Sequence, residues 1–415
     1  MKFVADFHIH SKYSRATSKD MDLENLDKWA KIKGIKVMGT GDFTHPEWLA
    51  NLKDKLEPAE SGLFKLKKDD QETRFLLTAE ISCIYSKNNK VRKIHIIVFA
   101  PSFEAVEKIN VQLGWIGNLK SDGRPILGLD AKELAKIVLE SDPSCMVIPA
   151  HIWTPWFALF GSKSGFDSIK ECFEEYSKDI YAMETGLSSD PAMNWRLSFL
   201  DRITLISNSD SHSPQKIGRE ANVFNTELSY QAITEALKTK DSKKFLYTIE
   251  FYPEEGKYHF DGHRNCEVRL SPKETKKYGG LCPVCGKPLT IGVLNRVEEL
   301  ADREEGFIPP DRIPFKSLVP LNEIIADVIG VGTASKEVGK EYDNLISSIG
   351  SEFEVLLESQ ESVLKSITSP EIAEGIIKVR EGKVVKSPGY DGVYGKISVF
   401  SEGEKKTSTN QKTLF

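Results

Sequence analysis

The sequence predicts an α/β fold with a distorted seven-stranded (β/α)7 barrel at its start, a small cysteine-bearing module after it, and a helical carboxyl-terminal region. From residue 1 to about residue 220, short apolar runs rich in β-branched residues alternate with amphipathic stretches of helical spacing, a pattern typical of a largely parallel sheet. After residue 245, paired cysteines and then helical patterns replace this alternation. We therefore divide the chain into a barrel (1–245), a cysteine-bearing module (246–316), a helical region (317–400) and a polar tail (401–415).

Seven apolar runs are the candidate barrel strands, which is one fewer than in the common (β/α)8 barrel. Helical patterns such as LENLDKWAKIKG and KELAKIVLES lie between most of them. In chain order the runs are FVADFHIH, IKVMGTGDF, RFLLTAEISCIY, KIHIIVFA, CMVIPAHI, DIYAMETG and ITLISNSDSH.

The composition is that of an ordinary soluble globular protein, with 40% hydrophobic and 28% charged residues. No apolar run approaches the length of a membrane span, and polar residues interrupt any signal-peptide core at the start, so we expect a cytoplasmic protein without a membrane partner. Six cysteines do not make a disulfide framework. A net charge of −5 means that a polyanionic partner must meet local positive patches.

Histidines and carboxylates gather at or near the ends of the predicted strands. His8 and His10 are two residues apart, so in a strand they point to the same face, and paired imidazoles suit a borderline metal ion. Because strand ends converge on one mouth of a barrel, the sequence predicts a polynuclear metal site there, although His95 alone could equally be a buried core histidine. The residues are His8, His10, Asp42, Glu80, His95, His151, Glu184, Asp210 and His212.

This combination resembles the PHP (polymerase and histidinol phosphatase) family of metal-dependent phosphoesterases over roughly residues 1–220. The resemblance rests on the HIH start, GDF, Glu80, His95, His151 and the closing DSH. It implies that one metal ion is held by His8, His10, Glu80 and Asp210, and a second by Glu80, His95 and His151, so that Glu80 bridges the two.

The chain departs from the family pattern at a third metal ion. Ala16 and Phe43 stand where the family usually has histidines. This leaves Asp42 and His212, with His45 as a further candidate, to hold a third ion. Without that ion, His212 could contact a phosphate or protonate the leaving oxygen.

The implied chemistry is phosphoester hydrolysis at two divalent ions, with Glu80, Asp210 and His212 as catalytic residues. Paired cations bind phosphoryl oxygens and lower the pKa of bound water towards about 7, so that hydroxide is available at neutral pH. The oxygen and imidazole ligands permit Zn, Mn, Mg or Fe.

A second metal site, of a structural kind, is predicted in the cysteine-bearing module. Two pairs of candidate ligands with two intervening residues match the spacing of a zinc ribbon or knuckle, and three thiolates with one imidazole would form a closed zinc site. His259 is an alternative to His263 as the fourth ligand. The ligands expected from spacing are His263, Cys266, Cys282 and Cys285.

The helical region contains a pattern, IADVIGVGTASKEV, that looks like a helix–hairpin–helix. Gly330 and Gly332 would let backbone N–H groups approach a DNA phosphate, although an ordinary helical turn fits equally well. The tail is polar and is expected to be disordered. Within it, Gln411 and Leu414 match the first half of a peptide that binds a sliding clamp.

As a whole, the barrel, the zinc module, the helices and the segment SPGYDGVYGKI resemble the endonuclease Q family. This implies an archaeal DNA-repair enzyme that nicks the phosphodiester 5′ to deaminated bases (uracil, hypoxanthine, xanthine) and to abasic sites. We expect the damaged base to flip out of the helix into a pocket walled by Trp153, Trp156 and Phe157, unless these aromatics pack the barrel rim. Two alternatives are a small-molecule phosphomonoesterase of the histidinol phosphatase type and a non-catalytic DNA-binding scaffold.

Overall fold

The computed structural model describes residues 1–67, 72–401 and 403–404 and has a mixed α/β fold. Each of the seven apolar runs contains a strand, so the predicted strand positions are confirmed. The strands are β1 (Lys2–Asp6), β2 (Val37–Gly39), β5 (Arg74–Lys87), β6 (Lys90–Ala100), β8 (Met146–Pro149), β9 (Ala182–Glu184) and β10 (Thr204–Ile206).

The strand pairing departs from an all-parallel closed barrel. Strands β1, β2 and β5 are parallel neighbours, but β6 is antiparallel to both β5 and β8. The reason lies in the connection: Asn88 and Asn89 have φ of 54° and 58° and make a two-residue hairpin turn, which leaves no room for a crossover helix. Strands β9 and β10 form a separate parallel pair, and a single isolated bridge between Ile9 and Ser211 joins the segments that follow β1 and β10. Closure into a seven-stranded barrel therefore stays a prediction.

The main sheet continues past β1 through strands that the sequence did not single out. β11 (Ala221–Asn225) is antiparallel to β1, β12 (Phe245–Glu250) is antiparallel to β11, and β15 (Phe315–Ser317) is parallel to β12. The predicted boundary at 245/246 thus falls within β12. Three short strands lie on the β5 side of the sheet: β3 (Leu56–Pro58), β4 (Phe64–Leu66) and β7 (Ile126–Leu127). Strands β4 and β7 each pair with β5, and β3 pairs with β4.

Helices cover the sheet because each presents one apolar face. In α4 (Ala131–Ser141), Leu134, Ala135 and Val138 are buried, and the Asp130 carboxylate accepts a hydrogen bond from the backbone of the first turn. The remaining helices of this part are α1 (Leu23–Lys33), α2 (Pro46–Lys55), α3 (Phe103–Ile116), α5 (Ile169–Phe173), α6 (Pro191–Asn194) and α7 (Tyr230–Thr239).

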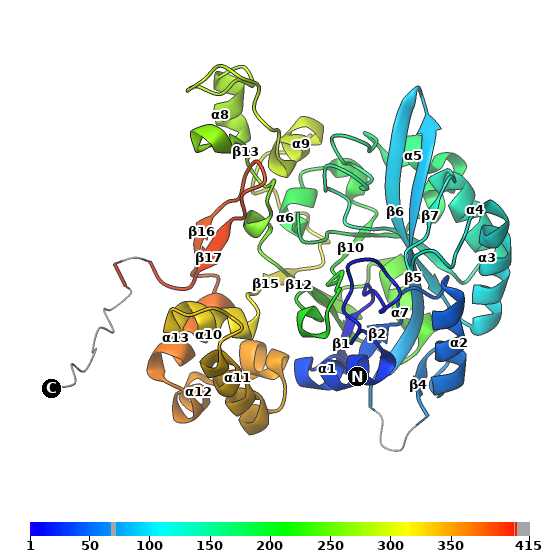
Figure 1. The fold of residues 1–415 in the computed structure, drawn as a ribbon, viewed down its shortest axis with the longest axis horizontal. Coiled ribbons are helices and arrows are strands. Elements are labelled where there is room, and N and C mark those ends of the chain that lie inside the picture. Colours follow the sequence, from blue (N-terminus) through cyan, green and yellow to red (C-terminus); the bar gives the residue numbers. More distant parts are fainter. Residues whose placement is uncertain (68–71, 402, 405–415) are drawn as a thin grey trace.

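The cysteine-bearing module is a short hairpin followed by two helices (Figure 1). The hairpin pairs β13 (Asp261–His263) with β14 (Val268–Leu270), and the helices are α8 (Pro272–Lys277) and α9 (Val293–Leu300). Ser271 begins α8 with a capping box to Glu274, which satisfies backbone donors at the start of the helix.

The carboxyl-terminal region is helical only up to Arg380. Its helices are α10 (Leu321–Ile329), α11 (Lys336–Ile349), a π-helical turn (Glu354–Glu358), α12 (Glu361–Ile367) and α13 (Pro370–Arg380). A hairpin of β16 (Val385–Ser387) and β17 (Lys396–Ser398) follows and returns to the cysteine-bearing module. There Tyr390 bridges Phe260, and Nη1 of Arg269 donates to Ser387 at 3.0 Å.

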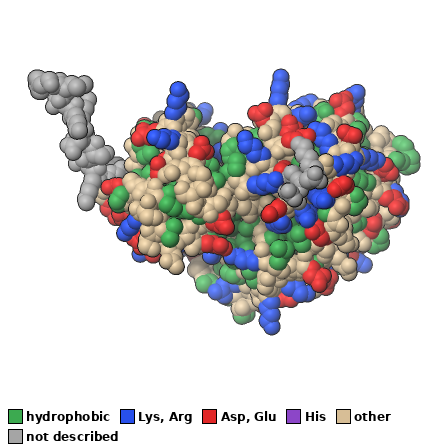
Figure 2. All heavy atoms as spheres, turned by 90° about the horizontal axis from the view of Figure 1, so that it is seen from below, with side chains coloured by type: hydrophobic (Ala, Val, Ile, Leu, Met, Phe, Trp, Pro, Cys, Tyr) green, Lys and Arg blue, Asp and Glu red, His purple; other side chains and the backbone are tan. Residues whose placement is uncertain are grey.

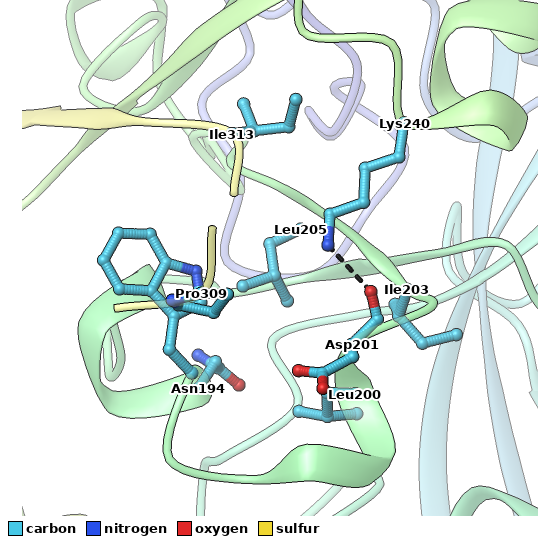
Figure 3. Close-up of a pocket in the computed structure, with 9 residues that line it drawn as sticks. Asn194, Leu200, Asp201, Ile203, Leu205, Lys240, Pro309 and Ile313 are labelled. Atoms are coloured by element: carbon cyan, nitrogen blue, oxygen red, sulfur yellow. Dashed lines mark hydrogen bonds between the residues drawn. The ribbon is translucent and has the colours of Figure 1, made fainter. Parts of the chain in front are cut away.

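Two further features of the molecule are the charge distribution on one face of its surface and a small cavity. On the face drawn in Figure 2, positive and negative side chains are interspersed, so no field of one sign dominates it. Figure 3 shows a small cavity of about 20 Å³, where Nζ of Lys240 donates to the carbonyl oxygen of Asp201 at 2.7 Å. Its walls come from α6, β10 and residues 309–313, and no predicted site residue lines it, so we regard it as a packing defect.

Candidate metal centre and active site

Four side chains converge on one point, and their donor atoms all lie within 4.8 Å of one another: His8, His10, Glu80 and Asp210. The two histidines follow β1, Glu80 lies on β5, and Asp210 follows β10. Nε2 of His10 lies 3.1 Å from Asp210 Oδ1 and 3.2 Å from Glu80 Oε2. Nε2 of His8 is buried without a hydrogen-bond partner among the described residues, and it faces the same two carboxylates at 3.5 and 3.6 Å. A buried, unpartnered imidazole nitrogen aimed at carboxylates fits a divalent cation.

A second group shares Glu80 and adds His95 and His151, again within 4.8 Å. Oε1 of Glu80 lies 2.7 Å from Nδ1 of His95 and 3.0 Å from Nε2 of His151, and these two nitrogens are 3.2 Å apart. The two oxygens of Glu80 therefore face different groups, Oε2 towards the first and Oε1 towards the second. This is the geometry that a bridging carboxylate needs.

The position of His95 differs from the predicted one. It lies in the middle of β6, across from Ser82 on β5, and not at the carboxyl end of a parallel strand. It reaches the mouth because β5 and β6 form a long hairpin, and this places His95 beside Glu80. His151, by contrast, follows the end of β8 as predicted.

Two further carboxylates orient the imidazoles. Glu184, at the end of β9, accepts from Nδ1 of His8 at 3.0 Å and from the backbone N–H of His151 at 2.9 Å. Asp42 lies 3.2 Å from Nδ1 of His10. Each contact directs the opposite nitrogen, Nε2, towards the first group, as carboxylates behind metal-binding histidines commonly do.

The electrostatics of the site are those of imidazoles surrounded by carboxylates. Burial opposes protonation of His8, but Glu184, Glu80 and Asp210 outweigh it and raise its pKa well above the ordinary value. Burial likewise opposes ionisation of Glu80, but His95, Arg124 and His8 hold its pKa well below the ordinary value. Protons on His8 and on His10, whose pKa is likewise raised, thus balance part of the negative charge that a cation would otherwise neutralise.

Three residues of the site have a strained backbone. Asp42, His151 and Asp210 have φ of 51°, 28° and 46°, a region that non-glycine residues rarely adopt. Next to His151, a Cβ on Gly186 would lie 2.5 Å from the His151 Cβ, so only glycine fits there. All three strained residues lie just beyond strand ends, where the backbone turns the side chain into the site.

Asp42 and His212 do not join either group. Asp42 Oδ2 accepts from the Ser11 backbone at 2.6 Å, the Ser11 hydroxyl at 2.6 Å and the Ser14 hydroxyl at 2.8 Å, so this oxygen is already occupied. The ring of His212 packs against that of His10 at a tilt of 46°, with ring centroids 4.4 Å apart, and its Nδ1 lies 2.9 Å from the carbonyl oxygen of Asp210. The predicted third-ion ligands are therefore turned to other partners. The same holds for His45, which lies 3.2 Å from the carbonyl oxygen of Lys120.

Arg124 is a site residue that sequence reasoning missed. Its Nη1 donates to Glu80 Oε2 at 2.9 Å, from a loop between α3 and β7. A single arginine in a glycine-containing loop shows no characteristic spacing to other candidate site residues, so no sequence pattern identifies it as part of the site. Only the fold, which packs this loop against the first two strand ends, brings the guanidinium to the metal ligands.

The aromatic residues after His151 separate into different environments. Trp153 is buried, and its Nε1 donates to Asn194 at 2.7 Å, so the prediction that it walls an open pocket is wrong. Phe157 packs on His95 with ring centroids 4.7 Å apart. Trp156 is 52% exposed and lines a cavity of about 240 Å³ together with Thr154, Ser188, Tyr258 and His259.

The cysteine-bearing module groups His263 with Cys266, Cys282 and Cys285, with donor atoms within 4.8 Å. Nδ1 of His263 lies 3.5 Å from Sγ of Cys285. His259, the alternative ligand, is buried elsewhere and stacks on Phe260. The donor set suits a closed zinc site of one imidazole and three thiolates.

In the helical region, Gly330 ends α10 in the left-handed conformation, with φ of 80°, and Ser335 begins α11. A Cβ on Gly332 would meet nothing within 4 Å, so the turn is open to a ligand. Gln411 and Leu414 lie outside the described residues. Within the described parts of the chain, no helix is both long and apolar enough to cross a membrane.

Relatives of known sequence match much of the chain. A family model described as the MJ0043 C-terminal domain matches residues 320–383. The protein MJ0043 of Methanocaldococcus jannaschii is 35% identical over 307 residues, which are 70% of this chain and 38% of that protein, so the chain spans well under half of this relative. The protein YqxK of Bacillus subtilis is 30% identical over 417 residues. The match covers 95% of this chain and 99% of YqxK. A bacterial relative of full length leaves the archaeal source a prediction.

Two solved structures match from end to end. The lesion-specific endonuclease PfuEndoQ from Pyrococcus furiosus has a TM-score of 0.86 and 31% identity, with 100% of both chains covered. An endonuclease Q in complex with a 27-mer duplex that carries an abasic lesion at the active site has a TM-score of 0.84 and 32% identity over 99% of both chains. This chain belongs to the endonuclease Q family.

Proposed function

We propose that this protein is a metal-dependent DNA-repair endonuclease that nicks a strand 5′ to a deaminated base (uracil, hypoxanthine or xanthine) or an abasic site. The observation that carries the proposal is Glu80, whose two oxygens face two separate groups of metal-ligating side chains. The likeness over the whole chain to an endonuclease Q bound to lesion-containing DNA supports the substrate class.

Two divalent ions would be held by His8, His10, Glu80 and Asp210 on one side and by Glu80, His95 and His151 on the other. When bound, such ions polarise phosphoryl oxygens and lower the pKa of bound water towards neutrality. Zn, Mn, Mg and Fe are all compatible with these ligands.

The surrounding residues would hold this arrangement and handle protons. Glu184 and Asp42 keep the Nε2 atoms of His8 and His10 directed inwards. His212 donates from Nδ1 to the Asp210 carbonyl oxygen, which leaves Nε2 free to contact the phosphate or to pass a proton to the leaving oxygen. Burial, together with the nearby His10, lowers the pKa of His212 and so favours its neutral form, whereas an adjoining phosphate anion would favour the protonated form.

The extruded base or abasic sugar would enter the cavity beside Trp156. Trp156 and Tyr258 offer aromatic surface for stacking, which contributes about 1–3 kcal/mol per base in other proteins. Thr154 links this cavity to the metal centre, because its hydroxyl lies 3.5 Å from Nδ1 of His151. The pocket would thus lie within reach of the scissile phosphate.

The remaining parts would bind the duplex and hold the fold. One zinc ion at His263, Cys266, Cys282 and Cys285 would be structural. The turn at Gly330 and Gly332 would approach the DNA backbone, and the tail, through Gln411 and Leu414, would bind a sliding clamp.

A nicking assay tests the proposal. Duplexes labelled at the 5′ end and carrying a single uracil, hypoxanthine, xanthine or abasic site should give a product that ends on the 5′ side of the lesion, and undamaged duplex should stay intact. A phosphomonoester assay run beside it addresses the phosphatase alternative. Hydrolysis of phosphomonoesters without nicking, or lesion binding without cleavage, would contradict the proposal.

A further inference from the structure

The loop of residues 117–125, which carries Arg124, is fixed on both sides of that residue. The backbone N–H of Gly123 donates to the Tyr13 carbonyl oxygen at 3.0 Å, and the Thr44 hydroxyl donates to the Gly123 carbonyl oxygen at 3.2 Å. On the other side, the Ser82 N–H donates to the Pro125 carbonyl oxygen at 3.0 Å. The loop is therefore tied to the segments that follow β1 and β2 and to β5.

Gly123 allows this loop to approach the site closely. A Cβ at this position would lie 2.3 Å from Asp42 Oδ2 and 2.4 Å from the Ser14 hydroxyl. Any larger residue would push the loop away from Asp42, which orients His10. Gly123 therefore allows Arg124 to lie close to the metal ligands.

The guanidinium of Arg124 is only partly used by the protein. Among the described residues, its single hydrogen bond runs from Nη1 to Glu80 Oε2, and the side chain is 27% exposed. Its other N–H groups remain available at the mouth, beside the oxygen of Glu80 that also faces His8 and His10. A planar fork of this kind matches the oxygens of a phosphate.

We infer that Arg124 is a catalytic residue that binds a non-bridging oxygen of the scissile phosphate and stabilises the charge that develops on it during cleavage. The inference rests on the proposed endonuclease function. The rigid loop holds the guanidinium in position before the substrate arrives, which is the condition under which a charged donor lowers a barrier most. A merely structural arginine, used to hold Glu80, would need no free donors at the mouth.

The test compares Arg124→Met with the wild type and with Lys120→Met, a control in the same loop that removes an exposed positive charge paired with Glu47. Single-turnover cleavage of an abasic duplex should fall about 10²- to 10³-fold in Arg124→Met and stay within about threefold in the control. Metal titration of Arg124→Met should show affinity at least equal to the wild type, because a cation that competes for Glu80 has been removed. Weaker metal binding would instead assign Arg124 a structural role.

A binding measurement without turnover gives an independent readout. With Ca²⁺ in place of the metal ions that support cleavage, replacing the scissile phosphate by a neutral methylphosphonate should weaken the binding of an abasic duplex more in the wild type than in Arg124→Met. Equal losses in both proteins would overturn the inference. Arg124→Lys, which keeps the charge but loses the fork, supplies the same test if Arg124→Met does not fold. A wild type that fails to nick any lesion would contradict the proposed function itself.

Discussion

The two candidate metal sites of this chain are built in opposite ways. The barrel site draws its six ligands from positions between 8 and 210, buries four of them fully, and relies on residues with strained backbone conformations. The module site uses ligands within residues 263–285, one of them exposed, on a short hairpin and a turn. The barrel site depends on the fold around it, whereas the module depends on its ion.

This difference follows from the size of the surrounding core. The barrel has large apolar clusters that hold the strands in place without any ion. The module has two three-residue strands and two short helices, too little to fold by burial alone. Removing a ligand should therefore abolish chemistry in the barrel and structure in the module.

The largest effect is expected for Glu80→Ala. The substitution removes an oxygen from both ligand groups, so cleavage should fall by more than about 10³-fold, beyond the loss typical of a single stabilising donor. The chain should still fold, because the core does not need the ion. Elemental analysis should show fewer ions per chain, and circular dichroism should be unchanged. Glu104→Ala, an exposed site on α3 paired with Lys108, serves as the control, and cleavage by Glu80→Ala near the wild-type rate would contradict the two-ion arrangement.

Cys282→Ser should have the converse effect. Cys282 is buried in the module, and the chain should lose about one zinc ion while the barrel keeps its own. Because structural zinc binding contributes directly to folding, residues 258–300 should become protease-sensitive and gain fast hydrogen exchange. Val284→Ala, at an exposed position of the same turn, should change neither. Full zinc content in Cys282→Ser would refute the closed site.

The same contrast explains what the sequence could predict. The module ligands are close in the chain, so their spacing alone predicted a group of His263 and the three cysteines, with His259 as the alternative to His263. The barrel ligands were predicted from strand ends and a family resemblance, and most lie where expected. Arg124 was missed because only the packing of its loop brings it to Glu80, and Trp153 was misassigned because its burial depends on Asn194, a residue 41 positions away. The antiparallel direction of β6 depended on a two-residue turn at Asn88 and Asn89 that the strand pattern did not reveal.

The pH dependence of stability should reveal the barrel ligands. In the metal-free protein, the raised pKa values of His8 and His10 mean that their stabilising contribution is fully present below pH 6.5 and is lost as the pH rises through the raised values. Glu80, with a lowered pKa, contributes above pH 4.5 and loses that contribution as the pH falls. The metal ion needs the unprotonated imidazoles. The gain in melting temperature when divalent ions are added to protein that holds only the zinc ion of the module should therefore grow from pH 6 to pH 9.

In His8→Gln, which lacks one of these imidazoles, that growth should be smaller, and scanning calorimetry of both proteins at several pH values checks it. A difference that does not depend on pH would mean that protons and metal ions do not compete at this site.

The smallest effect is expected for Gly332→Ala, in the turn between α10 and α11. A Cβ there meets no protein atom within 4 Å, so the fold should be unaffected. The added methyl group would, however, keep a DNA phosphate from approaching the backbone N–H. The loss of one such hydrogen bond should weaken duplex binding by roughly 2- to 10-fold, measured by fluorescence anisotropy at fixed salt. Gly339→Ala is the matched control, because its Cβ is also in open space but lies within α11. It should leave DNA affinity unchanged and raise stability by about 0.5–1 kcal/mol. Equal affinity in both variants would remove this turn from the DNA-binding surface and leave duplex binding to the barrel and the module.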